Sequence, residues 1–162
     1  MKSIVVYYSL TGNIDSLATT IAKLTDADIC KLELESEYPK NFFKFVKGGH
    51  DAVRHLTPKL KTILPDLSQY DRIYIGSPVW ASTYAPPIGS FLENYPLENK
   101  EIALFISYMG RTPGHTFKDM LAYLEPQNDL LDTIEFINPK KSDPEVVALQ
   151  LKQWIETLDT NA

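Results

Sequence analysis

Residues 3–8, Ser-Ile-Val-Val-Tyr-Tyr, form an almost wholly apolar run close to the N-terminus. The run does not alternate between apolar and polar side chains, so both faces of the strand that it predicts must be buried. Strands buried on both faces are typical of parallel sheets that helices cover on two sides. This run therefore favours a layered α/β architecture in which residues 3–8 form a central strand.

Four more strand-like segments follow, with helical patterns between most of them. The strands are predicted at 28–34, 71–77, 101–107 and 130–137, and the helices at 14–24, 86–95, 115–125 and from 144 onward. This alternation predicts a three-layer, doubly wound sheet of five parallel strands with right-handed crossovers. The length of 162 residues suits a single domain spanning 1–162.

Composition excludes several classes of partner and site. The net charge of -5 argues against nucleic acid or an anionic membrane as the main partner. One cysteine, Cys30, can form neither an internal disulfide nor a multi-cysteine metal site. The N-terminus runs straight into a strand, and no apolar run approaches the length of a membrane span. We therefore expect a cytoplasmic protein.

The turn between the first strand and the first helix is rich in hydroxyl, glycine and amide residues: Ser9, Thr11, Gly12 and Asn13. A strand that turns into a helix here leaves free backbone N–H groups at the positive end of the helix dipole. Such a terminus is a site for a phosphate. No Lys or Arg falls in residues 9–22, so hydrogen-bond donors would hold the phosphate without a neutralising cation nearby in sequence. The alternative is an ordinary turn and helix cap.

Two further loops are predicted at the same rim, because the carboxyl ends of parallel strands meet at one edge of a sheet. Residues 78–84 contribute Trp80 and Tyr84, and residues 108–114 contribute Tyr108 and two glycines. A phosphate site beside aromatic side chains fits a phosphorylated, flat, conjugated ligand.

At these loops the chain resembles the flavodoxin-like family. Residues 9–13, Ser-Leu-Thr-Gly-Asn, follow its Ser/Thr-x-Thr-Gly-Asn phosphate loop, and residues 76–80, Gly-Ser-Pro-Val-Trp, resemble its flavin-stacking loop. The resemblance implies strand order 2-1-3-4-5 with flavin mononucleotide (FMN) at the switch point. It also implies three groups of FMN-binding residues: Ser9, Leu10, Thr11, Gly12, Asn13 and Ile14 at the phosphate; Pro78, Val79, Trp80 and Ala81 at the isoalloxazine; and Ser107, Tyr108, Gly110 and Gly114 on its other side.

Two features depart from a minimal electron carrier of this family. Many electron carriers of the family have a glycine in the second loop, where the backbone peptide flips and forms a hydrogen bond to the one-electron-reduced flavin. This chain has no glycine between Gly76 and Gly89. The segment 38–61 is basic, with Lys40, Lys44, Lys47, Arg54, Lys59 and Lys61 against one acid, Asp51. That segment is interpreted either as a solvated helix face or as a dock for an anionic substrate or nicotinamide nucleotide.

Three functions remain open. The first is an FMN-binding redox protein that passes electrons between a partner protein and an acceptor. The second is an FMN-dependent NAD(P)H:quinone or acceptor oxidoreductase, in which segment 38–61 would cover the flavin. The third is a flavin-free interaction module, against which the intact phosphate loop and Trp80 argue. No residue stands out as a catalytic acid or base, and no metal-ligand spacing occurs.

Overall fold

A computed structural model of the chain describes residues 1–41 and 43–161. Phe42, within the basic segment 38–61, lies outside the described residues, and so does Ala162. The elements in chain order are β1 (Ser3–Tyr7), α1 (Asn13–Thr25), β2 (Asp28–Lys31), α2 (Phe43–Val53), η1 (Leu67–Gln69), β3 (Arg72–Trp80), β4 (Thr83–Tyr84), α3 (Pro86–Asn94), β5 (Glu101–Tyr108), α4 (Thr116–Leu124), β6 (Asp129–Ile137), η2 (Pro139–Lys141) and α5 (Pro144–Asn161).

The sheet has the order β2-β1-β3-β5-β6, and all these neighbours are parallel. Because β4 is a short strand that pairs only with β3, the strands predicted as fourth and fifth are β5 and β6. The predicted fold class and strand order are therefore confirmed. The first strand is central, as the unbroken apolar run predicts, and every residue of β1 is buried.

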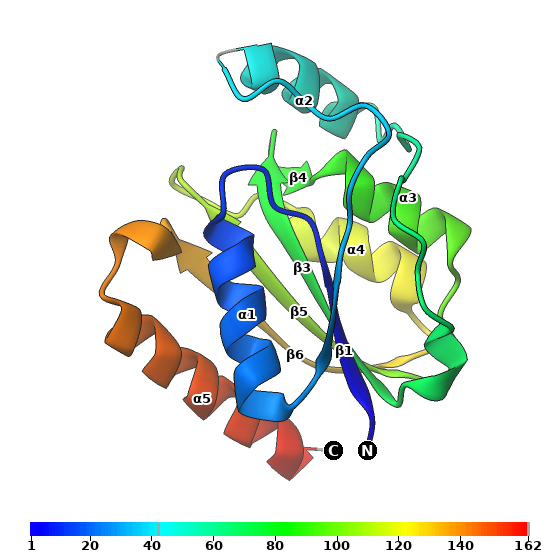
Figure 1. The fold of residues 1–162 in the computed structure, drawn as a ribbon, viewed down its shortest axis with the longest axis vertical. Coiled ribbons are helices and arrows are strands. Elements are labelled where there is room, and N and C mark those ends of the chain that lie inside the picture. The colour runs from blue at the N-terminus through cyan, green and yellow to red at the C-terminus, as the bar shows by residue number, and fades with distance from the viewer. Residues whose placement is uncertain (42, 162) are drawn as a thin grey trace.

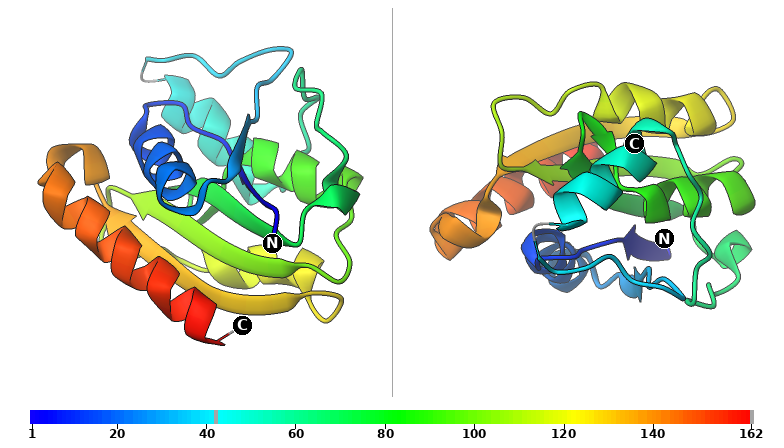
Figure 2. Two further views of the ribbon diagram at one scale, coloured as in Figure 1. Left: turned by 60° about the horizontal axis from the view of Figure 1, so that its bottom comes forward. Right: turned by 90° about the horizontal axis from the view of Figure 1, so that it is seen from above.

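Two helical layers cover the sheet, with α1 and α5 on one face and α3 and α4 on the other (Figures 1 and 2). Along β1, alternate side chains enter different cores. Ile4 and Val6 join the core beneath α3 and α4, whereas Val5 joins the core beneath α1 and α5. No helix in the described part of the chain combines the length and hydropathy that crossing a bilayer requires.

The segment predicted as an irregular loop at 78–84 is a β-hairpin instead. Strand β3 continues to Trp80, and Trp80 and Val79 pair with Thr83 and Tyr84 of β4. Two residues, Ala81 and Ser82, close the hairpin, both with positive φ. Positive φ at both central residues defines a type I′ turn, which usually contains glycine or asparagine. The sequence has neither residue there, so it carried no hairpin signal.

The basic segment 38–61 folds over the carboxyl-terminal edge of the sheet as helix α2 and its connections (Figure 1). Its last two lysines lie away from this helix and form ion pairs along the strand-like connection: Lys59 with Glu35 at 3.0 Å and Lys61 with Glu33 at 3.9 Å. The segment is therefore not one continuous charged helix face.

Candidate functional site

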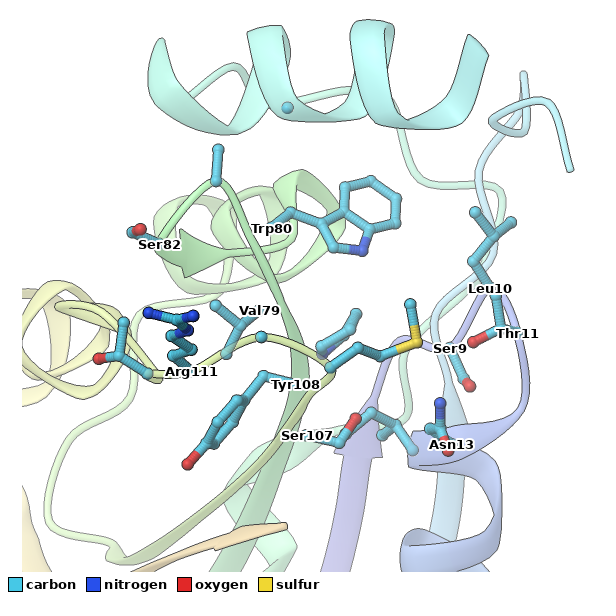
Figure 3. Close-up of a pocket in the computed structure, with 17 residues that line it drawn as sticks. Ser9, Leu10, Thr11, Asn13, Val79, Trp80, Ser82, Ser107, Tyr108 and Arg111 are labelled. Atoms are coloured by element: carbon cyan, nitrogen blue, oxygen red, sulfur yellow. The ribbon is translucent and has the colours of Figure 1, made fainter. Parts of the chain in front are cut away.

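A cavity of about 400 Å³ opens at the carboxyl ends of β1, β3 and β5, beneath α2 (Figure 3). Phosphate-loop side chains border it on one side, and the β3–β4 hairpin and the loop after β5 border it on the others. Its volume lies within the range of about 300–1,000 Å³ that is usual for small-molecule sites. The lining residues are Ser9, Leu10, Thr11, Asn13, Ile14, Gly49, Pro78, Val79, Trp80, Ala81, Ser82, Ser107, Tyr108, Met109, Gly110, Arg111 and Thr112.

The amino terminus of α1 faces this cavity without a side-chain cap. Gly12 is the N-cap residue with φ 93°, and no side chain among the described residues caps the helix there. The first helical hydrogen bond is donated by Ser16 to the carbonyl of Gly12, so the N–H groups of Asn13, Ile14 and Asp15 have no acceptor within the helix. Uncapped donors at the positive helix end favour an anion.

Ser9 holds this loop in shape. The N–H of Gly12 donates to Ser9 Oγ at 3.1 Å, so this backbone donor is engaged within the loop. The hydroxyl of buried Ser9 keeps its own proton, and Ser9 lines the cavity. Ser9 can therefore accept from the loop and donate to an anion at the same time.

Trp80 is fixed by two perpendicular aromatic contacts. Its ring centroid lies 5.7 Å from that of Tyr8 and 5.0 Å from that of Tyr38, with interplanar angles of 84° and 89°. Gly48 of α2 lies over the indole, because a Cβ at that position would come within 2.9 Å of two ring carbons. Edge-to-face contacts of this kind are favourable and directional, so the indole has a defined orientation at the wall of the cavity.

Two hydrogen bonds hold the region around α2, one within segment 38–61 and one from this segment to β4. Tyr38 Oη donates to Asp51 at 2.9 Å, and His55 Nδ1 lies 3.0 Å from Tyr84 Oη. Burial, followed by the hydrogen bond to Asp51, raises the pKa of Tyr38. Burial, followed by the contact with Tyr123, raises the pKa of Tyr84. Both phenols therefore stay protonated at neutral pH and can hold α2 over the cavity.

The hairpin and the loop after β5 are joined through their backbones. The N–H of His115 donates to the carbonyl of Ser82 at 2.9 Å. Gly114, with φ 62°, packs so closely that a Cβ there would lie 2.3 Å from the Ser82 carbonyl oxygen. Glycine is therefore required at position 114 by both its backbone conformation and its contact. Two of the cavity's walls are thus built as one unit.

The far side of the cavity carries Tyr108 and a cation. Tyr108 Oη donates to Glu135 at 3.1 Å, and burial raises the pKa of Tyr108, with a further contribution from Glu135. Arg111 is exposed and lines the same wall (Figure 3). A buried phenol and an exposed guanidinium therefore flank the loop after β5.

All the residues predicted to bind a cofactor line this one cavity except Gly12 and Gly114. Those two glycines lie behind the wall, where they shape the phosphate loop and the contact with Ser82. Five further residues line the cavity but were not predicted from the sequence: Gly49, Ser82, Met109, Arg111 and Thr112. Four of these residues belong to the two loops that were predicted at the rim. For the fifth, Gly49, the signal in the sequence was the Gly48-Gly49 pair within a helical stretch, which allows α2 to approach the cavity closely.

The acidic and histidine side chains of the described residues lie apart from one another or in pairs. Among the described residues, no group of three or more His, Cys, Asp or Glu side chains converges as a metal site would require. His115 Nδ1 is bonded to Asp119, whose Oδ2 also accepts from Thr83 Oγ1 at 2.6 Å. This cluster ties the start of α4 to β4.

Comparison with solved structures supports the fold. A protein from Bacteroides eggerthii is 18% identical, with a TM-score of 0.75 and 98% coverage of both chains. A flavoprotein from Lactobacillus acidophilus in complex with FMN is 23% identical, with a TM-score of 0.70, covering 83% of this chain and 92% of its own. Oxidised flavodoxin 2 from Bacillus cereus is 17% identical, with a TM-score of 0.64 and complete coverage of both chains.

No curated protein matches the chain. A family model described as Flavodoxin matches residues 2–158, which is nearly the whole sequence. The match includes the phosphate loop, the β3–β4 hairpin and the loop after β5, whose residues surround the cavity. The chain therefore belongs to the flavodoxin family.

Proposed function

We propose that the protein binds FMN in this cavity and transfers electrons through the bound flavin. The observation that carries this proposal is the uncapped amino terminus of α1, which opens into the same cavity as Trp80. One ligand with an anionic end and a flat conjugated ring would satisfy both. The FMN complex of the similar Lactobacillus acidophilus flavoprotein supports this choice of ligand.

The phosphate end would be held by hydroxyl, amide and backbone donors. Thr11 is exposed at the loop, and Asn13 lines the cavity at the first residue of α1. The free N–H groups of the first helical turn point the same way as the helix dipole, so a phosphate there gains both hydrogen bonds and electrostatic stabilisation. Ser9, Leu10 and Ile14 complete the set of lining residues at this end.

The ring would lie between the hairpin and the loop after β5. Pro78, Val79 and Trp80 form one wall, and Ser107, Tyr108 and Gly110 form the other. Because Trp80 is already held by Tyr8 and Tyr38, little side-chain freedom would be lost when a ring stacks there. This rigidity supports a planar aromatic ligand over a flexible one.

When bound, FMN would supply redox chemistry that no amino-acid side chain provides. The chain's part is to position the ring and to limit solvent access. Helix α2 covers the Trp80 side, and Gly49 of α2 lines the cavity. Covering of this kind leaves less of the ring edge open to a large protein partner than a bare sheet edge would.

A second candidate function is an NAD(P)H:quinone or acceptor oxidoreductase. Two observations favour it. Lys40, Lys47 and Arg54 are exposed within α2 or close to it in sequence, and these cations suit the phosphates of a nicotinamide nucleotide. The turn at Ala81 and Ser82 also lacks the glycine that a flip of its central peptide requires. Without that flip, the backbone of the hairpin offers no hydrogen bond that would stabilise a one-electron-reduced flavin.

Anaerobic titration of the FMN-loaded protein separates these two functions. Stepwise reduction is followed by visible absorbance, first with a chemical reductant and then with NADPH or NADH. A carrier is expected to accumulate the one-electron-reduced flavin and to ignore nicotinamides. An oxidoreductase is expected to bleach directly with a nicotinamide. Protein that retains no flavin after incubation with FMN would exclude both functions.

A further inference from the structure

A cation reaches the phosphate loop from the far end of the chain. Lys140 belongs to η2, the short 3-10 helix between β6 and α5. Its Nζ donates to the carbonyl of Thr11 at 3.1 Å. Its backbone N–H donates to Asn13 Oδ1, also at 3.1 Å. The two bonds lie on either side of Gly12, so η2 is attached to the loop at two points.

Gly12 makes this contact possible. A Cβ at position 12 would lie 3.1 Å from Lys140 Nζ, 3.5 Å from Cδ and 3.7 Å from Cε. The aliphatic stem of Lys140 therefore crosses the bare backbone of Gly12 instead of extending into solvent. Among the described residues, no carboxylate forms an ion pair with Lys140. Its charge is thus held at the loop without an acidic partner from the described chain.

From this geometry we propose that Lys140 is the counter-ion of a phosphate at the amino terminus of α1, so that the site prefers a phosphorylated flavin over an unphosphorylated one. The inference rests on the proposed FMN site. An ammonium has three donors, and the Thr11 carbonyl takes one, which leaves donors for a phosphate oxygen. Thr11 itself lines the cavity, and its carbonyl is the group that the ammonium contacts.

The same segment also orients Asn13. Because Asn13 Oδ1 accepts from the backbone of Lys140, its side-chain NH₂ group is left as the free end of the amide. That end carries two donors at a residue that lines the cavity. Lys140 therefore acts on the phosphate site in two ways: its side chain supplies a charge, and its backbone N–H fixes the rotamer of Asn13.

The test compares two ligands that differ only in the phosphate. Dissociation constants for FMN and riboflavin are measured with the wild-type chain, Lys140→Met and Lys141→Met. Lys141 is the matched control, because it is exposed, adjacent and carries the same charge. We expect Lys140→Met to raise the dissociation constant of FMN about tenfold, which corresponds to about 1.4 kcal/mol. The dissociation constant of riboflavin is expected to stay unchanged. Lys141→Met is expected to change neither constant.

Two further measurements sharpen the result. Lys140→Arg keeps the charge and is expected to retain most of the preference for FMN. Raising the salt concentration is expected to reduce the difference between wild type and Lys140→Met, because exposed charges are screened. Unchanged riboflavin binding also shows that the variant is folded.

The outcomes distinguish this inference from the proposed function. If the wild-type chain binds FMN and Lys140→Met keeps the wild-type ratio of FMN to riboflavin affinity, the role of Lys140 is wrong and the FMN site stands. Equal weakening of FMN and riboflavin binding in Lys140→Met would also overturn the proposed role of Lys140, since that result indicates that Lys140 is needed for the structure of the site. If the wild-type chain binds neither flavin, both proposals fail.

Discussion

The carbonyl of Ser82 in the β3–β4 hairpin accepts a hydrogen bond from the backbone N–H of His115 at 2.9 Å. This bond joins the second and third loops of the cavity, and Gly114 lies in the contact between them. Both loops border the proposed isoalloxazine position. The distance between the two walls therefore depends on a contact that a single methyl group would disturb.

Gly114→Ala is expected to separate these loops. The new Cβ would lie 2.3 Å from the Ser82 carbonyl oxygen, and the residue has φ 62°. We expect a loss of about 2 kcal/mol in unfolding free energy, from strain and the displaced hydrogen bond, together with weaker FMN binding. Gly110→Ala is the control for the unfolding free energy, since a Cβ there meets nothing within 4 Å. Equal unfolding free energies for the two variants would contradict this account.

Ala81→Gly tests the turn at the end of the hairpin. Ala81 and Ser82 have φ values of 49° and 67°, and a left-handed conformation costs a non-glycine residue about 1–2 kcal/mol. A flip of the central peptide to a type II′ turn requires glycine at the first central position. We therefore expect Ala81→Gly to raise the unfolding free energy by about 1 kcal/mol and to increase the amount of one-electron-reduced flavin at half reduction.

Ser82→Gly is the matched control for that experiment. Ser82→Gly also removes the strain of a non-glycine residue at positive φ. In the flipped turn, however, position 82 has a negative φ, so serine does not prevent the flip. Its unfolding free energy is expected to rise, whereas the reduction profile is expected to stay as in wild type. An identical reduction profile for Ala81→Gly and wild type would show that Ala81 does not restrict the flip.

The position of α2 is tested at two adjacent glycines. Gly48→Ala and Gly49→Ala each gain about 1 kcal/mol of helix propensity. At position 48, however, the new Cβ would come within 2.9 Å of the Trp80 ring, whereas at position 49 it would meet Ala81 Cβ at an ordinary 3.8 Å. Gly49→Ala is therefore expected to be the more stable variant, and only Gly48→Ala should shift the fluorescence of Trp80. A similar emission spectrum for both variants would rule out tight docking of α2 on Trp80.

Alkaline pH is expected to loosen the segment around α2. Burial and the bond to Asp51 raise the pKa of Tyr38 above its ordinary value, which is about 10. Because the folded-state pKa is the higher one, the stabilisation is complete below about pH 10 and is lost as the pH rises further. Urea unfolding across this range should show a steeper decline for wild type than for Tyr38→Phe. Parallel curves would mean that Tyr38 does not contribute to the decline.

Most of the architecture could be predicted because it depends on local patterns. The unbroken apolar run of β1 requires burial on both faces, and Ile14, Leu17 and Ile21 follow the helical period of α1. The phosphate loop is also local, since its residues are consecutive and its helix begins at Asn13. These features need no knowledge of distant contacts.

The remaining features depend on contacts between distant residues. Lys140 reaches Thr11 across 129 positions, which no local pattern indicates. Helix α2 lies over the cavity because Trp80 packs against Tyr38 and Gly48, although the sequence equally allowed a solvated surface helix. The hairpin turn at Ala81 uses residues that rarely adopt this conformation, because tertiary contacts to the next loop hold it in place.

The central claim is that the cavity binds FMN, and one spectrum tests it most directly. The purified chain is incubated with excess FMN, separated from free flavin by gel filtration, and its visible absorbance is compared with its protein concentration. We predict flavin bands corresponding to about one FMN per chain, shifted from those of free FMN because the ring lies against Trp80. Protein that emerges without flavin bands would contradict the account.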